Sequence, residues 1–95
     1  MTEVNENLVY RIVSAAMLMD DDLIVPGVRH FSPDMRLVLD RIYGKGYHLR
    51  VKEQGFIDTH GNFLGRESAW ERANQTGQIL RDCGTTGKLF SENLY

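Results

Sequence analysis

Several features that mark large classes of protein are scarce or missing in this sequence. It has one cysteine and two prolines among 95 residues, and no run of like charge is longer than Asp20, Asp21 and Asp22. The single Cys83 cannot form an internal disulfide, which favours a reducing compartment. No stretch approaches the roughly 18 apolar residues of a membrane span, and the first residues lack the basic and apolar segments of an export signal. We therefore expect a cytosolic protein that does not enter a membrane.

The charge balance and the motifs argue against other classes. The formal net charge is −2, whereas proteins that bind duplex nucleic acid usually present a basic face that neutralises phosphates. The histidines and Cys83 show no metal-binding spacing, no serine or cysteine lies in a catalytic signature, and no phosphate-binding glycine loop is present. The sequence therefore favours a binding protein over an enzyme, with no metal or other cofactor and no duplex partner.

The length sets the domain organisation. Ninety-five residues with 42% hydrophobic and 25% charged side chains are typical of one small globular domain, here residues 1–95. Such a short chain buries a limited share of its surface, so subunits that share a core would gain stability. We expect a homodimer or a larger homo-oligomer.

The pattern of apolar and turn residues predicts an α+β fold, that is, an α/β protein with a small antiparallel sheet, two helices and a docked C-terminal tail. β-Branched and alternating residues favour strands at four places: 8–19, 23–29, 47–57 and 63–64. The three aspartates provide a turn after the first strand, and residues 58–62 provide one before the last. Pro26 lacks a donor for the ladder, so the second strand should lie at an edge of the sheet.

Two helices are predicted from caps and periodicity. Ser32 can cap a helix whose first position is Pro33, and Gly44 should end it. Its apolar stripe consists of Met35, Val38, Leu39 and Ile42. The second helix should run over 66–78, with three residues facing the core: Ala69, Trp70 and Ala73.

The segment beyond Leu80 has no periodicity and should be a loop followed by an extended tail. The tail carries apolar residues that would be unfavourable in water: Leu89, Phe90, Leu94 and Tyr95. We therefore expect it to dock on its own subunit or on a neighbouring one.

Arg29 and His30 are candidates for a phosphate site. They lie where a predicted strand leads to a capped helix, and the free amides at a helix N-terminus attract anions. A structural alternative is equally simple, with Arg29 paired to a carboxylate such as Asp34 and His30 filling a half-buried turn. An anion site would need an open concave surface.

Phe56 could bind a nucleoside. A purine could stack on its ring while Asp58 or Asn62 hydrogen-bonds the ribose hydroxyls. Phenylalanine at the end of a strand is more often buried in the core, and Phe63 is the stronger core candidate of the two.

Arg66 opens the second helix, where a positive side chain opposes the helix dipole. This placement suggests either a phosphate bound at the same helix end or an ion pair with Asp58 or Glu67. The sequence leaves the two readings open.

Four segments resemble a group of small phage and prophage proteins: IVPGVRH at 24–30, EQGFIDTHGNFLGRESA at 53–69, TGQI at 76–79 and KLFSENLY at 88–95. Their shared skeleton is an Arg-His pair after a strand, then QGF, a turn, GxF, an arginine, an alanine-containing helix ending in GQ, and an LFSE-type tail. The skeleton resembles the anti-Thoeris family of phage sponges, which hold cyclic ADP-ribose isomers made by bacterial TIR-domain defence proteins and do not cleave them.

The resemblance implies an α/β fold with an antiparallel sheet, assembly into homodimers or rings in the host cytoplasm, and ligand pockets that involve neighbouring subunits. It also implies roles for single residues. Phe56 would stack on adenine, Arg29 with His30 and Arg66 would face the pyrophosphate, and Asp58 would serve a ribose hydroxyl.

Three further residues complete the ligand site that the resemblance implies. Ala16 would offer a small surface against the ligand ring, and Lys88 and Ser91 would close the pocket. Gly65 departs from the pattern, because relatives tend to carry Asp or Asn before the arginine, and this removes the polar side chain expected to contact the ribose.

The expected function is that of a phage counter-defence protein that binds and sequesters a cyclic nucleotide immune signal without cleaving it. Two alternatives are open. The chain could inhibit a host defence protein directly, through its tail and the acidic patch at 20–22, or it could be a small cyclic-nucleotide phosphoesterase that uses His30 and His60.

Overall fold

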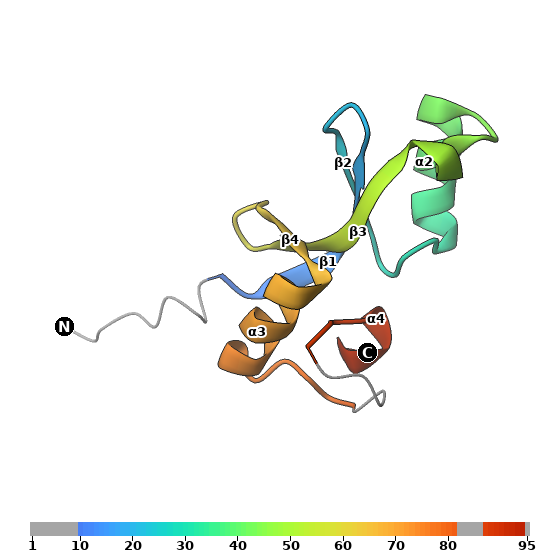
Figure 1. Ribbon diagram of the computed structural model, residues 1–95. Helices are drawn as coiled ribbons and strands as arrows, with labels where there is room; N and C mark the ends of the chain where they lie inside the picture. Colours follow the sequence, from blue (N-terminus) through green and yellow to red (C-terminus); the bar gives the residue numbers. More distant parts are fainter. Residues whose placement is uncertain (1–9, 82–86, 95) are drawn as a thin grey trace.

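A computed structural model describes residues 10–81 and 87–94 (Figure 1). The expected strand start at Leu8, Cys83 and the Tyr95 end of the tail lie outside these residues. Four strands form one antiparallel sheet in the order β2-β1-β3-β4. They are β1 (Ile12–Met19), β2 (Ile24–Gly27), β3 (Val51–Asp58) and β4 (Phe63–Gly65). The predicted α+β fold is confirmed, and β2 with Pro26 lies at an edge, as expected.

Within the described residues, two main helices and two short ones accompany the sheet. They are α2 (Pro33–Tyr43), the 3-10 helix η1 (Tyr47–Arg50), α3 (Arg66–Thr76) and α4 (Ser91–Leu94). The helices α2 and α3 lie well apart in Figure 1, and the sheet runs between them. None of the described helices has the length and apolar character that a membrane crossing requires.

The strand register sorts the sheet residues onto two faces. Ala15 is paired with Phe56, and Met17 is paired with Val25; partners across an antiparallel ladder point to the same face. These residues join buried side chains of the helices and the tail in one core: Met35, Leu39, Ala69, Ala73, Leu89 and Leu94. The opposite face carries half-buried apolar residues outside this core, namely Leu18, Ile24, Ile57 and Phe63.

The prediction of a strand beginning at Tyr47 was wrong for its first four residues. Residues Tyr47–Arg50 form η1, and the strand begins at Val51. The partner strand β1 ends at Met19, which is opposite Val51, so the residues before Val51 have no strand beside them to complete a ladder. Tyr47 is buried and stacks on the His48 ring, whereas Leu49 is 90% exposed.

The first predicted helix is confirmed, but its apolar stripe is covered on one side only. Met35 and Leu39 are fully buried, whereas Val38 and Ile42 are 42% and 52% exposed. The helix packs mainly on β2 and η1 at the end of the sheet. These two elements cover only one side of its apolar stripe. Ser32 takes the N-cap position without bonding a helix amide; its hydroxyl donates instead to the Arg29 carbonyl oxygen, at 2.7 Å.

The second helix ends two residues earlier than predicted. Gly77 has a φ of 68° and accepts the left-handed conformation that stops α3 at Thr76. Gln78 is therefore not on the helix surface. Its amide oxygen accepts from the Ile12 amide at 2.8 Å, and its amide nitrogen donates to the Ile12 carbonyl at 2.8 Å, so it pairs with the start of β1.

The C-terminal tail docks on its own subunit, which is one of the two arrangements that the sequence predicted. Leu89 is fully buried and Leu94 is 8% exposed. Buried Asn93 donates to the Arg81 carbonyl and accepts from the Phe90 amide, both at 2.8 Å. The tail is not extended throughout, because Ser91–Leu94 forms the short helix α4.

Candidate functional site

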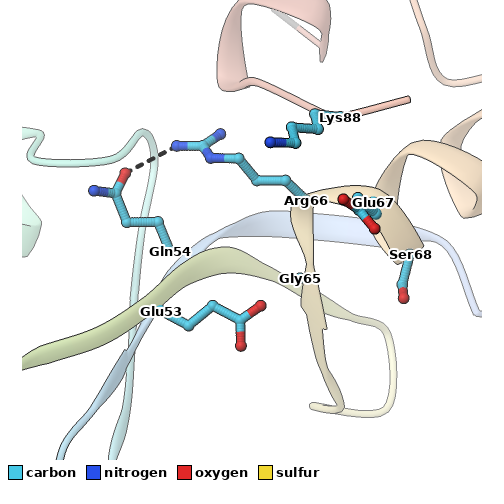
Figure 2. A pocket seen from close by; sticks show the side chains of 7 residues that line it. All are labelled: Glu53, Gln54, Gly65, Arg66, Glu67, Ser68 and Lys88. Carbon is cyan, nitrogen blue, oxygen red and sulfur yellow. Dashed lines mark hydrogen bonds between the residues drawn. The ribbon is translucent and has the colours of Figure 1, made fainter. Parts of the chain in front are cut away.

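A polar pocket opens beside the first residues of α3. It has a volume of about 430 Å³ and is lined by Glu53, Gln54, Gly65, Arg66, Glu67, Ser68 and Lys88. Figure 2 shows that these side chains come from three separate parts of the chain, namely β3, the junction of β4 with α3, and the C-terminal segment. The volume lies in the range of small-molecule sites, roughly 300–1,000 Å³.

The pocket reaches around the β4 edge of the sheet. Glu53 and Gln54 leave β3 on opposite sides, as successive strand residues do, and both line the pocket (Figure 2). Gly65 lies between them on β4 and has no side chain to block the passage. A methyl group on Gly65 would meet the carboxylate at the flexible end of Glu53, so a side chain at this position would occupy the space that the Glu53 carboxylate now takes.

Arg66 is the most firmly held charged group of the pocket. Its guanidinium donates to the Leu89 carbonyl oxygen at 2.8 Å and to Gln54 Oε1 at 2.9 Å, and it lies 4.4 Å from the centroid of the Phe90 ring. Burial lowers the pKa of Arg66 from its ordinary value, and nearby Glu92 acts in the opposite direction. The guanidinium remains charged, because an arginine is not deprotonated in proteins. The structure therefore fixes a half-buried cation at the pocket wall.

Lys88 supplies a second positive charge to the same pocket. Its side chain is exposed, and in Figure 2 it extends toward the guanidinium of Arg66. Two cations side by side repel each other unless an anion lies between or beside them. Glu53 and Glu67 of the lining offset part of this charge.

Arg29 lies outside the lining of this pocket. Its guanidinium is 3.9 Å from the carboxylate of Glu92 in an exposed ion pair. The Asp34 carboxylate, the alternative partner, accepts from the Val28 amide at 3.1 Å. The structure thus brings Arg66 together with Lys88, and not with Arg29, at the pocket.

His30 links the sheet to the C-terminal helix. Its Nε2 is 2.7 Å from the Gly55 carbonyl oxygen, and its Nδ1 is 3.1 Å from the Ser91 hydroxyl. Because a carbonyl can only accept, Nε2 carries the proton and Nδ1 accepts from Ser91. Burial lowers the pKa of His30, and the positive charge of Arg66 lowers it further. His30 and Ser91, which is 3% exposed, hold the tail in place.

Two of the expected ligand contacts do not fit the structure. Phe56 is fully buried in the core, where its ring meets His30 edge-on at 5.0 Å, so it has no free face for an adenine ring. Ala16 is fully buried between its partners Pro26 and Gly55 on neighbouring strands, so it offers no surface to a ligand.

Asp58 is bonded within its own turn and lies away from the pocket. Its Oδ1 accepts from the amides of His60 and Asn62 at 2.9 and 3.0 Å, and its Oδ2 accepts from the Asn62 side chain at 3.2 Å. Burial acts to raise the pKa of Asp58, but these hydrogen bonds outweigh it and lower the pKa. Asp58 is 4% exposed, and its carboxylate stabilises the predicted turn at 58–62.

Sequence reasoning did not identify Glu53, Gln54 and Ser68 as pocket residues. The one signal was in the alternation of the predicted strand at 47–57, where Glu53 takes the position of an apolar residue after Tyr47, Leu49 and Val51. Within residues 10–81 and 87–94, no group of three or more His, Cys, Asp and Glu side chains could hold a metal ion.

Comparison with known proteins gives one match. The family model described as Phage T4 y16D protein matches residues 11–95 of the chain. No curated protein and no solved structure matches the chain.

Proposed function

We propose that this chain, which belongs to the Phage T4 y16D protein family, is a phage counter-defence protein that binds a cyclic ADP-ribose isomer in the host cytoplasm and sequesters it without cleavage. Membership of a phage family and the resemblance to the anti-Thoeris sponges support this proposal. The observation that carries it is the fixed guanidinium of Arg66 beside Lys88 in a pocket of ligand size.

The pyrophosphate of the signal would bind between Arg66 and Lys88. Two of the five N–H donors of Arg66 are used by Leu89 and Gln54, which leaves donors for phosphate oxygens. Charge-assisted hydrogen bonds to phosphate are shorter and stronger than neutral ones. The carboxylate of Glu53 would accept from ribose hydroxyls, which makes the pocket better suited to a nucleotide than to free phosphate.

Self-association is part of the proposal. A homodimer or larger homo-oligomer would add surface to a pocket that is open on one side and would enlarge the small core. This expectation is tested separately, by measurement of the mass in solution.

The proposal is tested by adding cyclic ADP-ribose isomers to the purified protein, removing free ligand and heating. We expect a raised melting temperature, because a ligand that binds the folded state stabilises it, and release of intact ligand on denaturation. A Lys88→Gln variant should bind about fivefold more weakly, or about 1 kcal/mol. Lys45→Gln, in the loop between α2 and η1, is the matched control and should bind as the parent does. Cleaved ligand, or no thermal shift with any isomer, would contradict sequestration.

The two alternatives have weaker support. Each aspartate of the acidic patch has a partner in its own chain: Asp20 pairs with Arg50 at 2.6 Å, Asp21 accepts from the Tyr43 hydroxyl, and Asp22 lies 3.5 Å from Lys52. A host protein would have to compete with these contacts. The phosphoesterase alternative needs His30 and His60 to act together. Both ring nitrogens of His30 are already bonded, and His60 lies in the 58–62 turn with its ring against that of Tyr10.

A further inference from the structure

We propose that the face of Trp70 is the platform on which the base of a bound nucleotide stacks. This inference rests on the proposed function, since it assigns the base end of a ligand whose phosphates lie at Arg66 and Lys88. Trp70 thereby takes the role that the sequence resemblance gave to Phe56.

A second hollow adjoins the phosphate pocket. It has a volume of about 350 Å³ and is lined by Glu67, Trp70, Glu71, Gly87 and Lys88. Glu67 and Lys88 line both hollows, so the two are neighbours beside α3. A ligand that reaches from one to the other needs an anionic end and an end that suits an aromatic surface.

The position of Trp70 on α3 suits contact with the base of a ligand whose phosphates lie at Arg66. Trp70 follows Arg66 by four residues, and residues four apart lie on the same side of a helix, one turn above the other. One turn is about 5.4 Å along the axis, a separation that a single sugar unit bridges between its base and its phosphate. The cation and the ring therefore face the same side at a spacing that a nucleotide matches.

The burial of Trp70 distinguishes a platform from a core residue. Ala69 and Ala73 of the same helix are fully buried, whereas Trp70 is half-buried, packs against the core and also lines the hollow. A ring that already packs against the core loses less conformational freedom when a ligand binds. Aromatic rings bind bases through their faces.

The charges around the ring favour a base that donates hydrogen bonds. The carboxylates of Glu67 and Glu71 line the hollow beside Trp70 and can only accept when ionised. A base with an exocyclic amino group, such as adenine, can donate to them, whereas a base edge of carbonyl oxygens would be repelled. The chemical class that fits both hollows is therefore an aminopurine nucleotide.

The single tryptophan makes a direct test possible, because all indole fluorescence of the protein comes from Trp70. Three probes separate the parts of the ligand: ADP, ribose 5-diphosphate, which is ADP without its base, and inorganic pyrophosphate. We expect ADP to quench the emission and to bind at least fivefold more tightly than ribose 5-diphosphate, since stacking of one base is worth roughly that factor or more. Ribose 5-diphosphate and pyrophosphate should bind without comparable quenching.

Variants at Trp70, measured by calorimetry, complete the test. Trp70→Leu should lower the affinity for ADP to that for ribose 5-diphosphate and leave the affinity for pyrophosphate unchanged, which also shows that the variant is folded. Trp70→Phe keeps an aromatic face and should restore most of the preference for ADP. If pyrophosphate binds but ADP binds Trp70→Leu as tightly as the parent, the base platform is refuted and the phosphate pocket stands. If the parent protein binds neither pyrophosphate nor ADP, the proposed function itself fails.

Discussion

His30 is held by both ring nitrogens between the sheet and the C-terminal helix. The Gly55 carbonyl fixes the proton on Nε2, and Nδ1 of the neutral ring accepts from the Ser91 hydroxyl. A second proton on the ring would place a charge in a half-buried site and near the positive charge of Arg66. The folded state therefore favours the neutral ring.

We predict a loss of stability in mild acid that depends on His30. Its pKa is lowered in the folded state from the ordinary value of 6.5, so the unfolded chain binds more protons between the lowered pKa and 6.5. The contribution of His30 is fully present above pH 6.5, falls as the pH decreases through this window and levels off below the lowered pKa. Urea unfolding at a series of pH values measures it.

The matched control for this prediction is His30→Gln, whose amide does not titrate in this range. The variant should be less stable at neutral pH but should show a smaller loss of unfolding free energy on acidification. Since the two proteins share every other residue, the difference between their pH profiles isolates His30. An identical pH dependence in the two proteins would contradict the assignment of the neutral ring.

Single residues also mark where sequence reasoning reached its limit for the site. Arg66 and Lys88 could be named from the sequence, because a cation at a helix start and a family-like tail motif are local features. Arg66 is fixed by the Gln54 side chain and by the Leu89 carbonyl. Both partners are distant from it in the sequence. Phe56 was named because short polar side chains follow its ring and because its motif resembled that of relatives. The pairing of Phe56 with Ala15, which buries it, is a long-range property.

Among the elements, those with strong local signals were predicted well. Pro33 sets the start of α2, Gly77 stops α3 within two residues of the expected end, and the 58–62 turn forms as its residues require. The segment Tyr47–Arg50 was not predicted, because its alternation satisfies a strand only where another strand lies beside it. The half-covered stripe of α2 could not be foreseen either, since burial depends on how far the sheet extends under the helix.

The C-terminal segment is an element that depends on tertiary contacts, and we predict that Leu89 anchors it. Leu89 is fully buried in the core, and Leu89→Ala would remove its packing and leave a cavity. The expected loss is about 2–5 kcal/mol in the free energy of unfolding, and denaturant titration measures it. Lys88 and the Leu89 carbonyl bonded to Arg66 belong to the same segment, so phosphate binding should weaken as well.

Leu49→Ala is the matched control for the anchor, because Leu49 is a leucine that is 90% exposed on η1. Its replacement should change the free energy of unfolding by less than about 0.5 kcal/mol. Equal effects of the two substitutions would show that the C-terminal segment does not pack on the core as described.

At the scale of the whole molecule, the described part of the chain leaves much apolar surface outside its core. Six large apolar residues among residues 10–81 are more than half exposed: Val13, Val28, Leu37, Ile42, Leu49 and Leu80. The sheet face with Leu18, Ile24, Ile57 and Phe63 adds half-buried apolar side chains that take no part in the core. A protein of this size can bury such surface at low cost by pairing with another copy of itself.

We therefore predict that the protein self-associates in solution. Sedimentation equilibrium should give a mass of at least twice 10.9 kDa, and the melting temperature should rise with protein concentration, because association of folded subunits stabilises the folded state by mass action. Trp70→Leu lies in the ligand pocket and should keep the same mass, which separates assembly from ligand binding. A mass that stays at 10.9 kDa over about two orders of magnitude in concentration, with a constant melting temperature, would refute self-association. The pocket would then be built from a single chain, and the carboxylates and cations of that chain alone would have to enclose the ligand.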